Sequence, residues 1–444
     1  MDVTRASASS TEAEKTIKSQ QNEQGVGNER GVMNHAPTER ATHIQIKEVL
    51  RDIKYYGQVF WRKWFASFKE VFPIFLATRL AFFVTTCLSG LFTIRDFYWA
   101  PFPLDDLWQW WYRWDTGLFM DIAAHGYTTI SHTAFFPLYP LLERMVAPFV
   151  HHNFLIAGLL ISNAAGLVLL MVLYQLLLED FDHERATRAV LYLSLFCTAF
   201  YLASGYNESL FICLSLLCFY NLRHGSWLLA GSLGFLAGLT RSAGLLLIFP
   251  FCYEYLRQHE FKPQKLRVDV LSVLLIPFAV GLFALYCYYR FHDFLAFSQV
   301  QAIYWNRHLH FPWYGFVRSV RAIMISKGFL TFQALRNLTD LVPDLLVLTM
   351  IVLGIVGPWR FPKHLWVYGV YAVALYLFLI LFPMDGTGLF PLQSTGRFML
   401  EVFPAFIVLA TLGKYRLVHL NYLLVSGAVL FFLTTQFLTG HWVP

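Results

Sequence analysis

A series of long apolar runs constrains this chain more than any other feature. Residues 154–178, 268–289 and 365–382 are almost wholly apolar, and each approaches or exceeds the ~18 residues that a helix needs to cross a hydrocarbon core. The runs are apolar on every face, whereas strands of a membrane barrel alternate apolar with polar residues. Only 14% of the residues are charged, against roughly 25% in a soluble domain. The sequence therefore predicts an all-α polytopic membrane protein.

The distribution of positive charge predicts the orientation of the chain. The net charge is +6, but Lys and Arg lie between the apolar runs rather than in one basic domain, which argues against nucleic acid as a partner. Residues 43–70 mix basic and aromatic side chains, a pattern typical of an amphipathic helix on a cytoplasmic membrane surface. Residues 71–444 then form a transmembrane domain of about 11 spanning helices. The basic connections come out cytoplasmic, as short cytoplasmic loops require: residues 257–267, 360–363 and 414–416.

Three segments lie outside the apolar runs. Residues 1–42 have the polar composition of a disordered cytoplasmic tail. Residues 95–153 and 290–340 form two long loops on the non-cytoplasmic side that are rich in Trp, Tyr, Phe, His and Arg. Because long loops on a rigid scaffold usually carry function, we expect the working surface on the non-cytoplasmic side.

Five short motifs follow one another along the chain and together resemble a known family. They are W-D-x-x-x-F from Trp114 with I-A-A-H-G-Y ending at Tyr127, A-F-F-P from Ala134, G-Y-N-E-S-L-F around Glu208, R-S-A-G from Arg241, and Gln299 to Gln301 with Trp305, followed by Gly396-Arg397-Phe398. Over most of residues 71–412 the pattern resembles the PIG-V mannosyltransferases, which add the second mannose in glycosylphosphatidylinositol (GPI) assembly, and their bacterial relatives.

The resemblance implies a GT-C-type glycosyltransferase bundle. It implies an inverting mannosyltransferase that moves mannose from a polyprenyl-phosphate-mannose donor to a GPI-like or phosphatidylinositol-type glycolipid on the non-cytoplasmic face. Membrane lipids, this donor and this acceptor are the expected partners, no cofactor or metal is expected, and a partner subunit is left open. Leu118 stands where eukaryotic members tend to have histidine, which favours a bacterial plasma membrane over the endoplasmic reticulum.

The expected chemistry selects three charged residues. An acceptor hydroxyl must lose its proton as it attacks the anomeric carbon, so a carboxylate is needed within hydrogen-bond reach, and Asp115 is the leading candidate for this catalytic base. Asp115 could instead cap the following helix, and Asp105 or Asp106 could supply the base. Arginine forks suit phosphate, so Arg241 and Arg397 are the candidates for holding the donor phosphate, with anchoring of helix ends as the alternative.

A second group of residues is expected to bind the acceptor or the sugar: Trp114, His125, Tyr127, Glu208 and Gln301. Each has a structural alternative, since Trp belongs to interfacial aromatic belts and a glutamate stabilises a helix start. Arg79 lies inside the first apolar run, so we expect a buried carboxylate or a lipid phosphate beside it.

Two other classes of function share part of this pattern. A transporter or flippase of lipid-linked sugars would also contain intramembrane arginines, but it would often show internal repeats, and none is evident. A protein O-mannosyltransferase would be expected to show an Asp-Glu pair in the first outer loop, and none is evident either.

Overall fold

The computed structural model describes residues 39–93, 104–384 and 388–443, without the side chains of 39–60, 92, 93 and 104–106. Its internal contacts divide the chain into two units, Met1–Trp61 and Arg62–Pro444, and the second contains the apolar bundle. The predicted tail falls largely outside the described residues. The predicted interfacial helix 43–70 and the start of the first span belong to one continuous helix, α2 (Glu39–Thr93).

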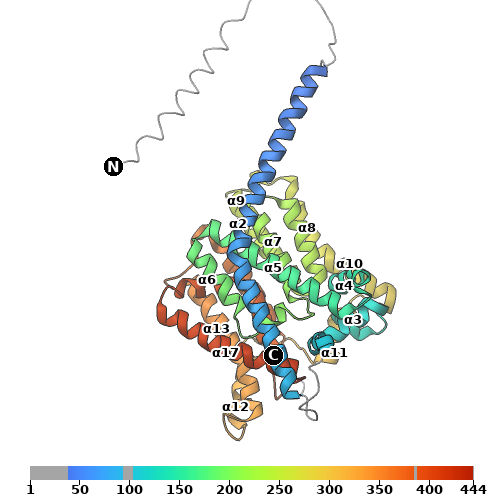
Figure 1. The fold of residues 1–444 in the computed structure, drawn as a ribbon, viewed down its shortest axis with the longest axis vertical. Coiled ribbons are helices and arrows are strands. Elements are labelled where there is room, and N and C mark those ends of the chain that lie inside the picture. Colours follow the sequence, from blue (N-terminus) through green and yellow to red (C-terminus); the bar gives the residue numbers. More distant parts are fainter. Residues whose placement is uncertain (1–38, 94–103, 385–387, 444) are drawn as a thin grey trace, which may run out of the picture. The chain divides into compact units, whose positions relative to one another are not determined.

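The described part of the chain is helical throughout and has no β-strand, which confirms the all-α prediction (Figure 1). Six helices in it are long and apolar enough to cross a membrane, and a pair bent by 79°, α15–η9 (Thr395–Glu401) with α16 (Phe403–Leu412), would make a seventh. The six are Trp61–Leu91 of α2, α5 (Phe154–Asp180), Val268–Phe291 with α10 (Leu275–Phe291), α13 (Phe332–Ile355), Lys363–Leu381 with α14 (Trp366–Leu381), and α17 (Arg416–Leu438).

Four further helices are too short to span alone, and one of them, Trp227–Thr240, is apolar. These are α6 (His183–Ser194), α7 (Glu208–Arg223), α8 (Trp227–Thr240) and α9 (Ile248–Gln258). A break at Arg241, where the backbone is extended, separates α8 from the 3-10 turn η5 (Ser242–Leu247) and α9. The expected count of about 11 spans treats each of these short helices as a crossing, and it stays a prediction.

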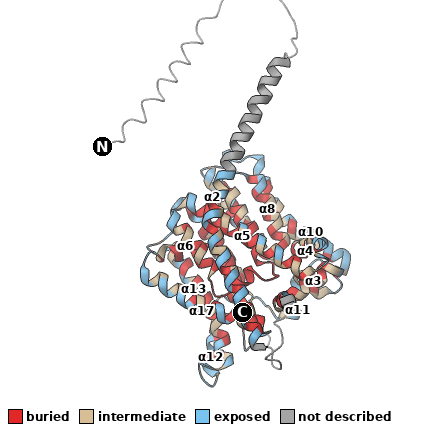
Figure 2. Ribbon diagram, viewed as in Figure 1, coloured by how far each residue is buried: buried red, intermediate tan, exposed pale blue. Residues whose placement is uncertain are grey.

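Small residues allow the central helices to pack closely. On α8, Gly231 faces Ser272 in the segment that leads into α10, and Gly234 and Gly238 face α10 itself. A Cβ on Gly234 would lie 2.7 Å from Ile276 Cγ1 and one on Gly238 2.8 Å from Ala279 Cβ. Close backbone approach of this kind is the usual way in which membrane helices associate. The result is a core in which α5 and α8 carry many buried residues (Figure 2).

A buried ion network closes one end of this core. Arg223 at the end of α7 donates to Asp180 Oδ1 at 2.7 Å and to Glu254 Oε1 at 3.0 Å, and Tyr368 of α14 donates to Asp180 Oδ2 at 2.6 Å. Because removing one partner would leave a buried charge uncompensated, this network fixes the ends of α5, α7, α9 and α14 relative to one another.

The two predicted outer loops are built from short helices. The first contains η1 (Leu104–Trp111), α3 (Asp115–His125), η2 (Ile130–Ala134), α4 (Leu138–Val146) and η3 (Ala147–Val150), and the second contains α11 (Ala296–Trp305) and α12 (Tyr314–Ile325). Both loops are therefore structured, as their composition indicated.

Of the two partners expected for Arg79, a carboxylate is not found among the described residues, and a lipid phosphate stays a prediction. Arg79 Nε donates to Asn163 Oδ1 at 2.7 Å and its Nη2 to the Leu202 carbonyl at 3.1 Å. An amide and a backbone carbonyl therefore satisfy this guanidinium, which also stacks on Phe75 with its Cζ 4.4 Å from the ring centroid.

Candidate active site

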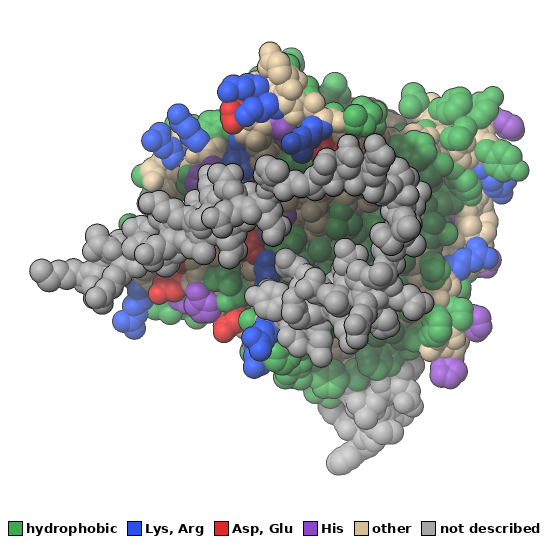
Figure 3. Space-filling view, turned by 90° about the horizontal axis from the view of Figure 1, so that it is seen from above, with side chains coloured by type: hydrophobic (Ala, Val, Ile, Leu, Met, Phe, Trp, Pro, Cys, Tyr) green, Lys and Arg blue, Asp and Glu red, His purple; other side chains and the backbone are tan. Residues whose placement is uncertain are grey.

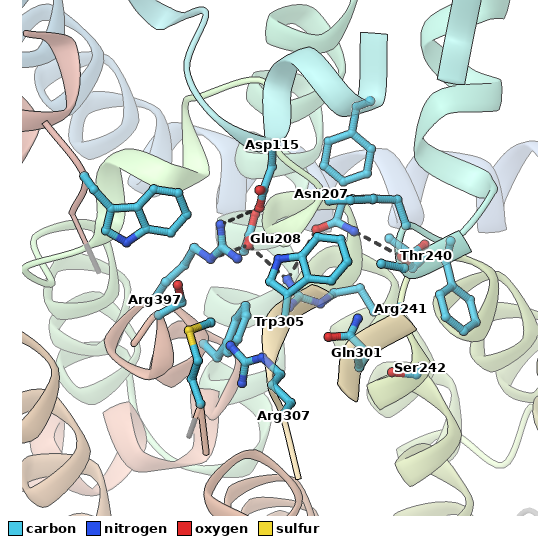
Figure 4. Close-up of a pocket in the computed structure, with 18 residues that line it drawn as sticks. Asp115, Asn207, Glu208, Thr240, Arg241, Ser242, Gln301, Trp305, Arg307 and Arg397 are labelled. Atoms are coloured by element: carbon cyan, nitrogen blue, oxygen red, sulfur yellow. Dashed lines mark hydrogen bonds and ion pairs between the residues drawn. The ribbon is translucent and has the colours of Figure 1, made fainter. Parts of the chain in front are cut away.

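A cavity of about 130 Å³ lies where the outer loops meet the ends of α7, α8 and α15 (Thr395–Phe398) (Figure 4). Charged and polar side chains face it together with aromatic rings. Its lining is Asp115, Phe119, Ala134, Phe135, Phe136, Asn207, Glu208, Thr240, Arg241, Ser242, Gln301, Trp305, Arg307, Met384, Ser394, Arg397, Phe398 and Trp442.

Asp115 projects a carboxylate into this cavity from the start of α3. The N-cap of α3 is Trp114, and Asp115 is the first helical residue, so the N-cap alternative for Asp115 is wrong. Its backbone N–H donates to the Tyr206 hydroxyl at 3.3 Å, and its Oδ2 accepts from Arg397 Nη1 at 2.8 Å. Oδ1 accepts no hydrogen bond from any residue that the structure describes, and the side chain keeps 17% of its surface exposed. One carboxylate oxygen is therefore available to a ligand.

Two arginines and two further carboxylates form the floor of the site. Glu208, at the start of α7, bridges Arg397 Nε at 3.2 Å and Arg241 Nη1 at 3.0 Å (Figure 4). Glu401 Oε1 lies 2.9 Å from Arg241 Nη1. The contacts of Arg397 Nε and of Glu401 are close enough for ion pairs but lack the alignment of hydrogen bonds. Arg241 and Arg397 thus have their charge balanced by acidic side chains.

Helix α13 holds Arg397 in place through two buried aspartates. Asp340 Oδ1 accepts from the Gly396 backbone N–H at 3.1 Å, and Asp344 Oδ2 accepts from Thr395 Oγ1 at 2.7 Å. A Cβ on Gly396 would lie only 3.1 Å from the Thr339 carbonyl oxygen, so this close approach favours glycine at that position. The segment that carries Arg397 is therefore fixed by contacts to a helix that precedes it in the chain.

Arg307 enters the cavity from the loop after α11. Its Nη1 and Nη2 donate to the carbonyls of Phe382 and Gln393 at 3.2 and 3.3 Å. Within the described residues it makes no ion pair with a carboxylate. Burial, with repulsion from Arg397 and Arg241, lowers the pKa of Arg307 to about 10, so the guanidinium is still charged at neutral pH. Because a guanidinium carries five N–H donors, several remain for a ligand.

Residues with positive φ precede site residues at three points. Trp114 has φ 48°, Asn306 φ 50° and Ser394 φ 70°. Such angles are uncommon for residues other than glycine, and strained backbone clusters at functional sites. They turn the chain directly before Asp115 and Arg307 and at the start of the segment that carries Arg397.

Most of the transmembrane domain matches a known protein family. Residues 85–374 match the family described as Mannosyltransferase (PIG-V). The chain belongs to this family. The matched region contains the first outer loop, the motifs around Glu208 and Arg241, and Arg307. Arg397, Phe398 and Trp442 follow it in sequence.

Mammalian proteins are among the relatives. GPI alpha-1,6-mannosyltransferase 2 of Mus musculus is 31% identical over 202 residues, and that of Cricetulus griseus is 32% identical over 202 residues. Each match covers 40% of this chain and 40% of the relative. The match therefore spans well under half of these relatives.

The solved structures that match this chain include two of the Archaeoglobus fulgidus oligosaccharyltransferase. The complex with Zn and sulfate matches with a TM-score of 0.43 at 13% identity, over 84% of this chain and 53% of that one. The form tethered with an acceptor peptide matches with a TM-score of 0.40 at 12% identity, over 83% of this chain and 56% of that one.

Five of the eight predicted site residues line the cavity of this PIG-V member: Asp115, Glu208, Arg241, Gln301 and Arg397. The other three do not. His125 is exposed and contacts Asp121 Oδ1 at 2.8 Å, while Tyr127 is buried and donates to the Phe135 carbonyl at 2.7 Å. Trp114 packs against Trp442 with ring centroids 4.6 Å apart, so it supports a wall of the cavity rather than forming one.

The side chains of the alternative bases Asp105 and Asp106 lie outside the described residues. Among the described residues, no group of three or more His, Cys, Asp and Glu is arranged to hold a metal ion. The site residues that were not predicted from the sequence include Arg307 and Trp442, which line the cavity, and Glu401, which pairs with Arg241. Arg307 carried one signal, a lone arginine two residues after Trp305, and Glu401 carried another, an acidic residue inside the expected span 397–412, whereas Trp442 carried none.

Proposed function

We propose that the chain is an inverting mannosyltransferase that moves mannose from polyprenyl-phosphate-mannose to a hydroxyl of a GPI-like or phosphatidylinositol-type glycolipid on the non-cytoplasmic membrane face. One observation carries the proposal. A carboxylate with a free oxygen, Asp115, shares a small cavity with three guanidiniums in a member of the PIG-V family. This is the pairing of base and cations that transfer from a phosphate carrier requires.

In the proposed step one bond forms and one breaks at the anomeric carbon. The acceptor oxygen attacks that carbon while its proton passes to Asp115 Oδ1. The bond from the carbon to the carrier phosphate oxygen breaks, and its electron pair leaves with the phosphate. Because a single displacement occurs from the opposite side, the anomeric configuration inverts.

Arg307 is the cation we assign to the departing phosphate. Arg241 and Arg397 already form ion pairs with Asp115, Glu208 and Glu401, whereas the two bonds that Arg307 donates go to neutral carbonyls. A guanidinium with free donors and no carboxylate is suited to a phosphate. Arg241 and Arg397 then contribute positive potential and orient the carboxylates.

Gln301 and Trp305 of α11 and Asn207 before α7 supply the remaining polar and aromatic lining that a sugar ring would contact. For localisation, the mammalian relatives fit the endoplasmic-reticulum alternative, and the bacterial plasma membrane stays a prediction.

Transfer from a labelled donor tests the proposal. Purified protein is incubated with radiolabelled polyprenyl-phosphate-mannose and candidate glycolipid acceptors, and wild type is compared with Asp115→Asn. We expect the variant to lose about 10²–10⁴-fold in rate, the usual contribution of a general base. Asp121→Asn is the matched control, because Asp121 lies on the same helix, is 44% exposed and does not line the cavity.

Two results would contradict the proposal. Equal transfer by Asp115→Asn and wild type would remove Asp115 from the chemistry. Movement of the sugar-lipid across liposomes without transfer to any acceptor would instead indicate a transporter.

A further inference from the structure

An apolar groove of about 650 Å³ runs along the outer face of α14 from Trp366 to Leu381. Trp366, Val370, Val373, Leu377 and Leu381 line it at successive turns of the helix, so at 1.5 Å per residue it is about 22 Å long. Its lining is apolar throughout, with Phe249 among the residues of the opposite wall. A groove of this form in a membrane-spanning bundle accommodates a hydrocarbon chain.

A second cavity, of about 450 Å³, meets the groove at Trp366 and has the opposite character. It is lined by Tyr253, Arg257, Phe261, Lys363, His364 and Trp366. No acidic side chain belongs to this lining. Figure 3 views the molecule from the end at which α9 lies in Figure 1, and Lys and Arg side chains gather on that face.

The rim of this cavity is held in place by the bundle. Tyr253 Oη donates to the Lys363 carbonyl at 3.3 Å, and Arg223 Nη1 donates to the His364 carbonyl at 3.2 Å. The backbone that presents both side chains is thus tied to α9 and α7.

Lys363 carries the positive charge that is free at this rim. Arg257 is neutralised by Glu254, to which it donates at 2.6 and 2.7 Å. Glu260, next to Phe261, is itself paired with Lys262 and Lys265. Lys363 makes no ion pair with any residue that the structure describes and is exposed, so its ammonium group is available to an anion.

We propose that the two cavities form one binding site for an anionic glycerophospholipid, with the phosphate headgroup at Lys363 and His364 and one acyl chain in the groove along α14. In the combined lining of the two cavities the charged side chains lie at the Trp366 end, which matches an amphiphile with an anionic head and an apolar tail. Basic pockets between spanning helices at a cytoplasmic surface bind anionic lipids in this way. The positive-inside pattern places Lys363 on that side, and the site does not depend on the proposed catalytic activity.

Lipid binding to the purified full-length chain tests the site. Native mass spectrometry measures the apparent affinity for phosphatidylglycerol and for phosphatidylcholine with the same acyl chains. We expect wild type to prefer phosphatidylglycerol and Lys363→Ala to bind it about five-fold more weakly, the usual effect of one basic residue near a lipid surface, with phosphatidylcholine binding unchanged. Lys414→Ala is the control, because Lys414 is also exposed and predicted on the same side but lines neither cavity.

The groove is tested separately from the rim. Val373→Trp fills it and should weaken binding of both phospholipids, and Leu377→Trp does the same at a side chain that is 40% exposed and so tolerates enlargement. Equal affinity of wild type for the two lipids, or equal effects of Lys363→Ala and Lys414→Ala, would overturn the proposal. So would displacement of phosphatidylglycerol by polyprenyl phosphate with no effect of Lys363→Ala, because the groove would then belong to the isoprenoid chain of the donor.

Discussion

Phe398 lies among the three guanidinium groups of the candidate active site. Its ring centroid is 4.5 Å from Cζ of Arg241, 4.7 Å from Cζ of Arg397 and 5.7 Å from Cζ of Arg307. The face of an aromatic ring attracts cations by about 0.5–2 kcal/mol each. The ring therefore helps three like charges to approach one small cavity.

Arg307 gives the first test at this scale. Arg307→Ala removes the guanidinium assigned to the departing phosphate, and we expect kcat to fall by about 10²-fold or more, the usual effect of deleting one transition-state donor. Single-turnover transfer from labelled donor measures it. Arg290→Ala is the control, since Arg290 donates to the Tyr127 carbonyl and does not line the cavity. If both variants transfer mannose at equal rates, the phosphate lies elsewhere.

Glu143 gives a second test, through pH. Its side chain is fully buried against Gly158, neither oxygen has a hydrogen-bond partner among the described residues, and burial raises its pKa well above the ordinary value. The folded state binds a proton at the Glu143 carboxyl more tightly than the unfolded state does. Protonated Glu143 therefore contributes fully to the free energy of unfolding below the unfolded pKa of about 4.3. This contribution is lost as pH rises towards the folded pKa, with a slope of at most about 1.4 kcal/mol per pH unit.

We therefore expect Glu143→Gln to flatten the fall of melting temperature between pH 5 and pH 8. Thermal unfolding in detergent at several pH values measures this slope. Glu184→Gln, at a side chain that is 77% exposed, should keep the wild-type slope. A slope that is unchanged in Glu143→Gln would show that the carboxyl ionises without cost in the folded state.

The sequence predicted those site residues whose type alone indicates a role. Asp115, Arg241 and Arg397 were chosen because transfer from a phosphate carrier needs a carboxylate as base and arginine donors for the phosphate. Arg307 was not predicted as a site residue. It differs from the other two arginines in having no carboxylate partner among the described residues, and this depends on the fold of the loop after α11. Trp114 and Tyr127 do not line the cavity although they belong to the motifs, because a motif does not show which way a side chain points.

At the scale of elements, the long apolar runs predicted helices well. The expected runs 154–178 and 268–289 correspond to α5 and to Val268–Phe291. The break at Arg241 falls between the expected spans 227–240 and 242–256. The break at Val402, inside the expected span 397–412, was not predicted, because Val402 is neither a proline nor a glycine. The first break places Arg241 in the cavity lining and the second places Glu401 beside Arg241, so both breaks contribute to the site.

The packing of α8 allows a test at the same scale. A Cβ on Gly231 would collide with the Ser272 backbone carbonyl, whereas one on Gly281 of α10 meets nothing within 4 Å. Alanine gains about 1 kcal/mol over glycine in a helix, so Gly281→Ala should be neutral or stabilising. Gly231→Ala should instead destabilise by about 1–3 kcal/mol through overpacking. Thermal unfolding of both variants in one detergent compares them, and equal melting temperatures would contradict the close contact.

At the scale of the whole molecule, the cationic cavity at Lys363 and the candidate active site lie at opposite ends of α14. Lys363 and the cationic cavity lie at the start of α14, whereas the carbonyl of Phe382, just after its end, accepts from Arg307 in the candidate active site. The positive-inside rule assigns the Lys363 end to the cytoplasm. The candidate active site then faces the other side, as a lipid-linked donor on the non-cytoplasmic face requires.

Cysteine labelling from one side of the membrane tests this orientation. Cys87→Ser and Cys252→Ser remove the two cysteines that are not buried. In that background, Arg144→Cys reports on the first outer loop, and Lys262→Cys and Lys414→Cys report on the opposite end. All three positions are exposed in the structure. With a membrane-impermeant maleimide and sealed cells or microsomes, we expect modification from the non-cytoplasmic side at position 144 only, and at positions 262 and 414 from the cytoplasmic side.

The labelling pattern bears on the chemistry as well as on the topology. If positions 262 and 414 are modified from the non-cytoplasmic side and position 144 is protected, the cavity with Asp115 opens to the cytoplasm. The donor sugar would then have to be presented on the cytoplasmic face, where soluble nucleotide sugars compete as donors, and the assignment of a polyprenyl-phosphate donor would fail together with the orientation.

If position 144 and position 262 are modified from the same side, the segment between α4 and α9 crosses the membrane an even number of times. The expected count has five crossings between these positions, one each for α5 to α9. An even number means that at least one of the short helices α6 to α9 does not cross the membrane, so the count of spans would fall.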